Sequence, residues 1–183
     1  MANNTDQVAV GAAGIVYVAP KGTTAPTDAS TALASAWKEL GIISEDGITI
    51  AEESDTTDIN GWAPTGVVRT VKTSYKETIA FTPIEVNSNV LQQMYGEDNV
   101  SVSDTGKIIA KHTGADLAEV CLCIDVVHSS KVKGRYFAAA AQLTEKGDLE
   151  LAGSDAAGRE LTYTCNPDTN GVTITEFEDI TTA

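Results

Sequence analysis

Alternating apolar and polar residues along most of the chain predict β-strands. Between residues 75 and 82, for example, Tyr75, Ile79 and Phe81 fall on one face of an extended chain. Turn-forming residues separate such segments at a spacing of roughly 8–12 residues, which is typical of a sandwich or barrel. The expected strands are 14–19, 37–44, 48–52, 67–73, 75–82, 99–103, 107–111, 118–127, 132–144, 149–152, 159–165 and 172–177.

One segment departs from this alternation and predicts a short α-helix at about residues 86–95. Its apolar residues between Val90 and Tyr95 share one helical face. Either Asn87 or Asn89 can cap the N-terminus, and Gly96 suits the position after the last turn. A helix this short needs a sheet to pack against.

Residues 52–66 are polar, acidic and rich in turn formers, and they predict a long loop. Trp62 stands out within it. The indole either packs back onto its own domain or docks in a neighbouring subunit, since tryptophan is enriched at interface hot spots. At the N-terminus, residues 1–13 are expected to form a flexible arm, which leaves 14–183 as a single β domain.

Composition and charge exclude several classes of protein. The chain has 183 residues, enough for one domain, and 12 basic against 26 acidic residues give a net charge of −14. Such a chain repels nucleic-acid phosphates, which excludes a specific DNA- or RNA-binding protein. There is no apolar stretch long enough to span a membrane and no signal peptide, so we expect no membrane partner. An odd count of three cysteines argues against a disulfide framework.

The residue types that carry catalysis form no recognisable motif. Cys121 and Cys123 share one face of a strand, with His128 nearby, but a structural zinc site needs a second ligand pair. His128 falls in a turn without a triad partner. A hydrolase on a jelly roll would need a concave cluster of titratable groups. We therefore expect no enzyme, no cofactor and no metal.

Four ordered segments resemble the major tail tube protein of phages with long non-contractile tails, those of actinobacteria in particular. The most specific are the turn Leu40-Gly-Ile-Ile-Ser-Glu-Asp-Gly47 and the helix start Asn87-Ser-Asn-Val-Leu91. The resemblance is good over residues 14–96 and loose beyond. The segments are 14–28, 37–47, 68–83 and 84–96.

The resemblance implies a mainly β fold of the tail tube type, a β-sandwich or barrel with one flanking helix. It further implies that six copies form a ring and that rings stack into a tube in the virion tail. The protein would be made in the host bacterial cytoplasm and would meet tape-measure, tail terminator and tip proteins. Double-stranded DNA would pass through without specific binding, because an acidic channel repels phosphates. The alternative is a phage decoration or receptor-binding β-sandwich domain.

Assembly would depend on two sets of residues. The long loop and the terminal arm are expected to make inter-ring contacts, so deleting residues 54–64 should leave a folded subunit that fails to polymerise. Basic residues on strands are expected either to face the channel, where they would locally weaken its acidic character, or to pair with acidic residues of neighbouring subunits. The candidates for stacking are Glu53, Asp55, Asp58 and Trp62, and those for inter-subunit charge pairing are Arg69, Lys72, Lys76, Lys133 and Arg135.

Overall fold

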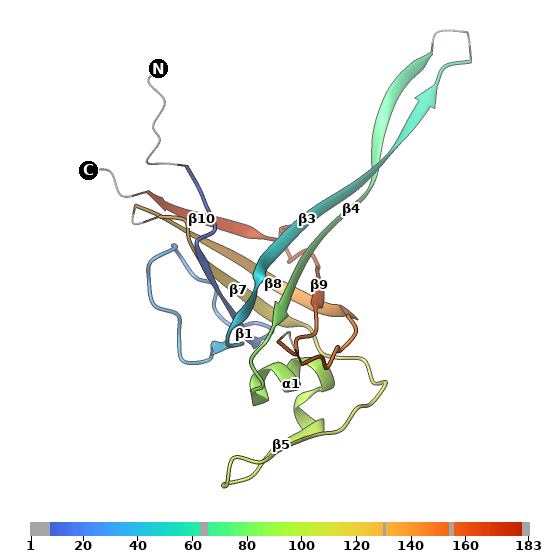
Figure 1. Ribbon diagram of the computed structural model, residues 1–183. Coiled ribbons are helices and arrows are strands. Elements are labelled where there is room, and N and C mark those ends of the chain that lie inside the picture. Colours follow the sequence, from blue (N-terminus) through green and yellow to red (C-terminus); the bar gives the residue numbers. More distant parts are fainter. Residues whose placement is uncertain (1–7, 63–65, 130, 154–155, 181–183) are drawn as a thin grey trace.

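The computed structural model describes residues 8–62, 66–129, 131–153 and 156–180 (Figure 1). That part of the chain is mainly β with one α-helix, as predicted, and the helix is too short to cross a membrane. The strands are β1 (Ala13–Pro20), β2 (Lys38–Glu39), β3 (Ile43–Asn60), β4 (Val67–Pro83), β5 (Val100–Val102), β6 (Ile108–Ala110), β7 (Val120–Val127), β8 (Val132–Lys146), β9 (Leu161–Cys165) and β10 (Thr175–Ile180). The helix is α1 (Ser88–Tyr95), followed by the 3₁₀ turn η2 (Glu97–Asn99).

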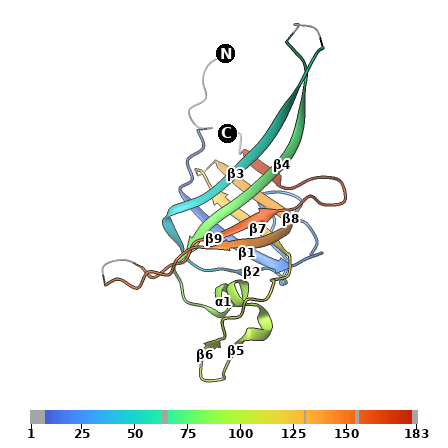
Figure 2. The ribbon, with the colours of Figure 1, turned by 90° about the vertical axis from the view of Figure 1, so that its right-hand side faces the viewer.

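Most strands of the described residues belong to one antiparallel sheet. Its order is β2-β1-β7-β8-β9-β4-β3, and β10 pairs with the first half of β8, beside β9 on the second half. The sheet curls so that its two ends approach each other: the Ile48 side chain of β3 lies against Gly14 of β1. Figure 2 shows the resulting open, barrel-like body, with β5 and β6 as a separate hairpin below it.

The core fills the inside of this curled sheet. Side chains from β1, β4, β7, β8 and β9 meet there, and the rings of Phe81 and Tyr163 stack with their centroids 5.8 Å apart. Helix α1 packs against the same core through Val90, Met94 and Tyr95, within the predicted apolar face. Each such side chain contributes about 1.5–3 kcal/mol on burial.

The caps of α1 settle which asparagine begins the helix. The side chain of Asn87 accepts a hydrogen bond from the backbone N–H of Val90 at 2.9 Å, so Asn87 rather than Asn89 is the N-cap. Gly96 follows the last turn with φ of 90°, a conformation that favours glycine. The predicted helix is confirmed, with a start two residues later than expected.

The predicted long loop at residues 52–66 is wrong. Residues 52–60 continue β3, and the strands expected at 67–73 and 75–82 form the single strand β4. Pairing between β3 and β4 satisfies the backbone hydrogen bonds of both strands, so neither face of this ribbon has to be apolar. Polar residues on both faces of β3 therefore gave the sequence pattern of a loop. Residues 63–65 lie outside the described part of the chain.

Neither residues 149–152 nor residues 8–12 form a strand. The strand expected at residues 149–152 is not formed, and both Leu149 and Leu151 are exposed, so these apolar residues pack on no sheet. Of the expected N-terminal arm at 1–13, residues 1–7 lie outside the described residues. Residues 8–12 are exposed and form no strand, and Ala13 begins β1.

Candidate assembly surfaces

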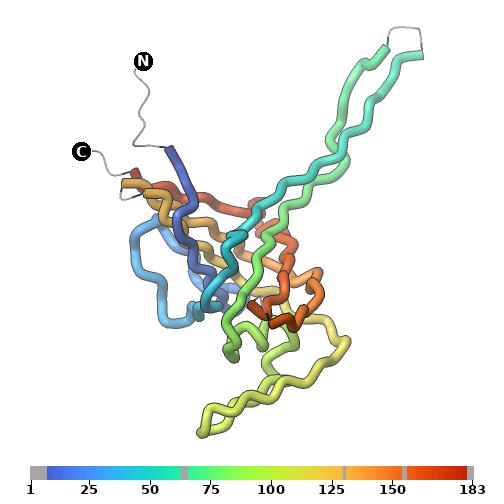
Figure 3. The backbone as a smooth tube through the Cα atoms, in the orientation of Figure 1, coloured from blue at the N-terminus to red at the C-terminus, as the bar shows by residue number. Residues whose placement is uncertain are grey.

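A largely exposed feature of the subunit is the outer part of the β3–β4 hairpin, residues 53–60 and 67–76, here called the hairpin arm. Strand β4 pairs with β9 only from Glu77 to Phe81, so beyond Glu77 the two arm strands pair with each other alone. Figure 3 traces them running side by side away from the body of the subunit. The arm therefore has two unpaired edges.

Both faces of the hairpin arm are also open. Every arm residue is exposed except Val71, which is half-buried. An isolated two-stranded ribbon is at best marginally stable in water, and unpaired strand edges invite pairing with another chain. The arm is thus a ready surface for association.

The charged residues of the arm are segregated by strand. On β3 they are all acidic (Glu53, Asp55 and Asp58), and on β4 they are all basic. Asp55 accepts a hydrogen bond from the Ser74 hydroxyl, and Asp58 accepts one from Thr70, each at 2.7 Å. These two carboxylates are therefore hydrogen-bonded across the ribbon to β4, and the strand that carries them, β3, forms one edge of the arm.

The basic residues Arg69, Lys72 and Lys76 lie on the other strand. The ammonium of Lys72 sits 3.9 Å from the ring centroid of Tyr75, a cation–π contact. Within the described residues, none of the three forms an ion pair inside the subunit. Their charges are available to acidic groups of another molecule.

Trp62 lies at the tip of the arm and is fully exposed, with a relative accessibility of 107%. It does not pack back onto its own domain, which removes one of the two alternatives left open by the sequence. Ile59, Val67 and Val68 are exposed beside it in the chain, at 52–67%. Together these four residues form an apolar tip that the subunit itself does not cover.

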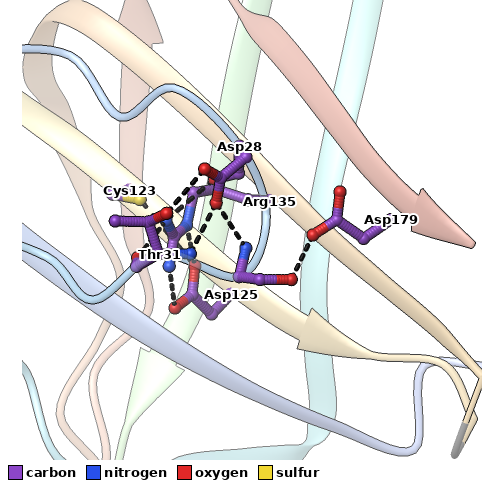
Figure 4. A network of polar contacts seen from close by, with 7 residues as sticks. Asp28, Thr31, Cys123, Asp125, Arg135 and Asp179 are labelled. Atoms are coloured by element: carbon purple, nitrogen blue, oxygen red, sulfur yellow. Dashed lines mark hydrogen bonds and ion pairs between the residues drawn. The ribbon is translucent and has the colours of Figure 1, made fainter. Parts of the chain in front are cut away.

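Arg135 has an intramolecular role. The side chain is 3% exposed on β8. Its Nε and Nη2 donate to the two carboxylate oxygens of Asp125 on β7, at 2.5 and 2.8 Å. Its Nη1 donates to the carbonyl oxygens of Asp28 and Thr31, at 2.9 and 2.8 Å (Figure 4). This clamp fixes the segment after β1 onto the sheet, so Arg135 is not available at the surface.

Asp28 organises the segment that the clamp holds. Its carboxylate accepts hydrogen bonds from the Thr31 hydroxyl, the Thr31 backbone N–H and the Ser30 backbone N–H. These bonds, the hydroxyl first, lower the pKa of Asp28 to about 2. Lys133, by contrast, is exposed on β8 opposite Asp179 of β10.

Sequence reasoning missed both the clamp and a cleft at the far end of the subunit. Asp125 and Arg135 are cross-strand partners in the β7–β8 ladder, a relation that only the register reveals. The cleft, of about 410 Å³, lies between α1 and the ends of β1 and β7. No sequence motif marks it, because its lining comes from four separate segments, at 18–21, 38, 89–97 and 117–120.

Within the described residues, no group of three or more His, Cys, Asp or Glu side chains is placed to hold a metal. The three cysteines are free and buried. Burial raises the pKa of both Cys123 and Cys165 to about 12, which keeps these thiols neutral.

A solved structure and a protein family resemble this chain. A chain of the PVC sheath–tube complex of an extracellular contractile injection system, solved in its extended state, is 11% identical. The match covers 96% of this chain and 98% of that one, with a TM-score of 0.47. No curated protein sequence matches significantly. The profile of the family described as phage tail tube protein matches residues 1–177. The chain therefore belongs to the phage tail tube protein family, structural components of the virion tail.

Proposed function

We propose that six copies of this protein close into a ring and that rings stack into the tail tube through which the phage genome leaves the capsid. The observation that carries this proposal is the hairpin arm, a two-stranded ribbon with both edges unpaired. In a subunit that works alone, both edges of the arm would stay unpaired in solvent. A ring of identical subunits gives each open edge a partner.

The direction of the arm strands supports lateral pairing. When equivalent arms stand side by side around a ring, β3 of one subunit lies next to β4 of its neighbour. These strands run antiparallel, so the hydrogen-bonding pattern of the hairpin continues across the interface. The acidic edge of one arm then faces the basic edge of the next, which favours this order of neighbours.

The net charge of −14 suits a conduit for DNA. An acidic channel repels phosphates, so double-stranded DNA passes without specific binding. In this proposal the protein is structural rather than enzymatic, needs no cofactor, and meets tape-measure, terminator and tip proteins at the ends and inside the tube. A decoration or receptor-binding β-sandwich, the alternative function, gives the arm no role.

Removing the arm tests the proposal. Deleting residues 54–64 would leave the β4 half of the arm without a partner, so the cleaner variant removes residues 54–75. It joins the cross-strand pair Glu53 and Lys76 through an Asn-Gly turn, which suits a two-residue hairpin. We expect a folded subunit that forms no tubes by negative-stain microscopy.

A control for the deletion is Val102→Ser, which changes an exposed residue of the β5–β6 hairpin and is expected to leave assembly intact. Circular dichroism and sedimentation would show that both variants fold. Tubes of normal length and diameter from the armless variant would overturn the proposal.

A further inference from the structure

We propose that Trp62 at the tip of one subunit's hairpin arm inserts into the cleft beside α1 of a subunit in the next ring. The inference rests on the proposed function and names the partner surface of the arm. It commits to one occupant of the cleft, a second copy of this chain.

The tip has the properties of an inserting group. Trp62 is fully exposed, and it is flanked by the exposed apolar residues Ile59 and Val67. A large aromatic side chain left in water has most to gain from burial, and tryptophan is among the residues that dominate interface energies.

The cleft has the properties of a receptor for that group. Its volume of about 410 Å³ lies within the range of roughly 300–1,000 Å³ that pockets for small organic groups occupy. Val18, Pro20, Leu117 and Val120 give it an apolar lining. Gln92 of α1 also lines it, and among the described residues its side-chain amide has no hydrogen-bond partner, which leaves a carbonyl oxygen for an indole N–H.

The relative placement of tip and cleft determines what such a contact builds. The hairpin arm projects from one end of the subunit and α1 lies at the other, as both ribbon views show (Figures 1 and 2). Within a ring of equivalent subunits all tips lie on one side and all clefts on the other, so two rings that meet tip side to tip side bring no tip to a cleft, whereas rings stacked tip side to cleft side satisfy every subunit. Each inserts its tip into the next copy and leaves its own cleft for the previous one, a heterologous contact that repeats along an axis. This accounts for growth into a tube rather than a closed pair of rings.

A mixing experiment separates the two halves of the contact. Trp62→Ala removes the inserting group and leaves the cleft. Ala118→Trp fills the cleft from an exposed lining position and leaves the tip. Truncating a hot-spot tryptophan weakens a contact by about 30-fold or more. We expect each variant alone to form single rings, and an equal mixture to form two-ring stacks that grow no further.

Val102→Trp adds the same side chain at an exposed position outside the cleft, and this control is expected to form normal tubes. Long tubes from Trp62→Ala alone would overturn the inference, as would a mixture containing only single rings. Either result leaves ring closure intact. Failure of the unmodified protein to form any ring would overturn the proposed function, and this inference with it.

A cross-link locates the contact directly. The double variant Trp62→Cys, Gln92→Cys places one new thiol at the tip and one in the cleft, while the three native cysteines are buried. Mild oxidation of the assembled protein is expected to give a ladder of disulfide-linked multimers on a non-reducing gel, with no ladder from either single variant. Absence of the ladder from assembled double variant would contradict insertion at this cleft.

Discussion

Arg135 and the cations of the hairpin arm differ in where their partners lie. Arg135 finds all its acceptors inside the subunit, on β7 and on the segment after β1. Arg69 and Lys76, which the sequence grouped with it, have no ion pair within the described residues. Residue type alone could not separate these roles, because the distinction depends on which residue lies opposite in the sheet. The arm cations are therefore the better candidates for contacts between subunits.

Removing the clamp should destabilise the subunit. Arg135→Ala leaves the Asp125 carboxylate and two carbonyl oxygens without their donor. We expect the free energy of unfolding to fall by about 3 kcal/mol, the low end for breaking a buried pair because Asp125 is partly exposed. Urea denaturation measures this, with Lys133→Ala as the control on the same strand. Equal losses for the two variants would show that the clamp contributes nothing.

Asp28 should give the subunit a defined acid sensitivity. Its pKa is about 2 in the folded protein against an ordinary 3.8, so its carboxylate stabilises the fold above 3.8 and stops doing so as the pH falls through about 2. Asp28→Asn is therefore expected to be less stable than the unmodified protein at neutral pH, with the gap closing toward pH 2. Thermal unfolding at a series of pH values measures the gap. The control is Asp104→Asn, at an exposed residue in the turn between β5 and β6. A gap for Asp28→Asn that stays constant across that range, or one equal to that of the control, would contradict this account.

Among the structural elements, α1 and the hairpin arm mark what the sequence could and could not predict. The apolar spacing of Val90, Met94 and Tyr95 predicted the helix, because those residues pack on the subunit's own core. The β3 half of the arm was mistaken for a loop, because it is polar on both faces and packs on nothing within the subunit except its β4 partner, which was itself predicted as strand. Periodicity reports burial inside one chain, so an element completed by another chain lacks that signal.

The segregated charges of the arm yield a prediction about lateral pairing. Reversing the β4 cations with Arg69→Glu, Lys72→Glu and Lys76→Glu sets acidic edges against acidic edges and should prevent ring formation. Adding Glu53→Lys, Asp55→Lys and Asp58→Lys exchanges the two edges and should restore rings. Single exposed pairs contribute only about 0.2–1 kcal/mol, so the triple changes are needed to resolve the effect.

Sedimentation velocity at low salt measures this restoration, and high salt should weaken the difference between the variants. Recovery of rings by the six-residue exchange is the decisive result. If the triple variant failed only because it misfolds, three further substitutions would not restore its assembly. Failure of the exchange to restore rings would place the arm charges outside the lateral interface.

The whole molecule is a barrel-like body with unsatisfied surfaces at opposite ends. One end carries the open hairpin arm with its apolar tip, and the other carries α1 and the cleft (Figures 1 and 2). Such polarity suits a subunit that repeats along an axis, and the curled sheet leaves its strand edges for neighbours around that axis. The family match and this shape point to the same mode of assembly.

A cryo-electron microscopy reconstruction of tubes assembled from the purified protein tests the central claim most directly. It should show six subunits per ring, with β3 of each hairpin arm hydrogen-bonded to β4 of the next and Trp62 enclosed by the ring above. The account would be contradicted by tubes in which both edges of each arm face solvent and other surfaces hold the subunits together.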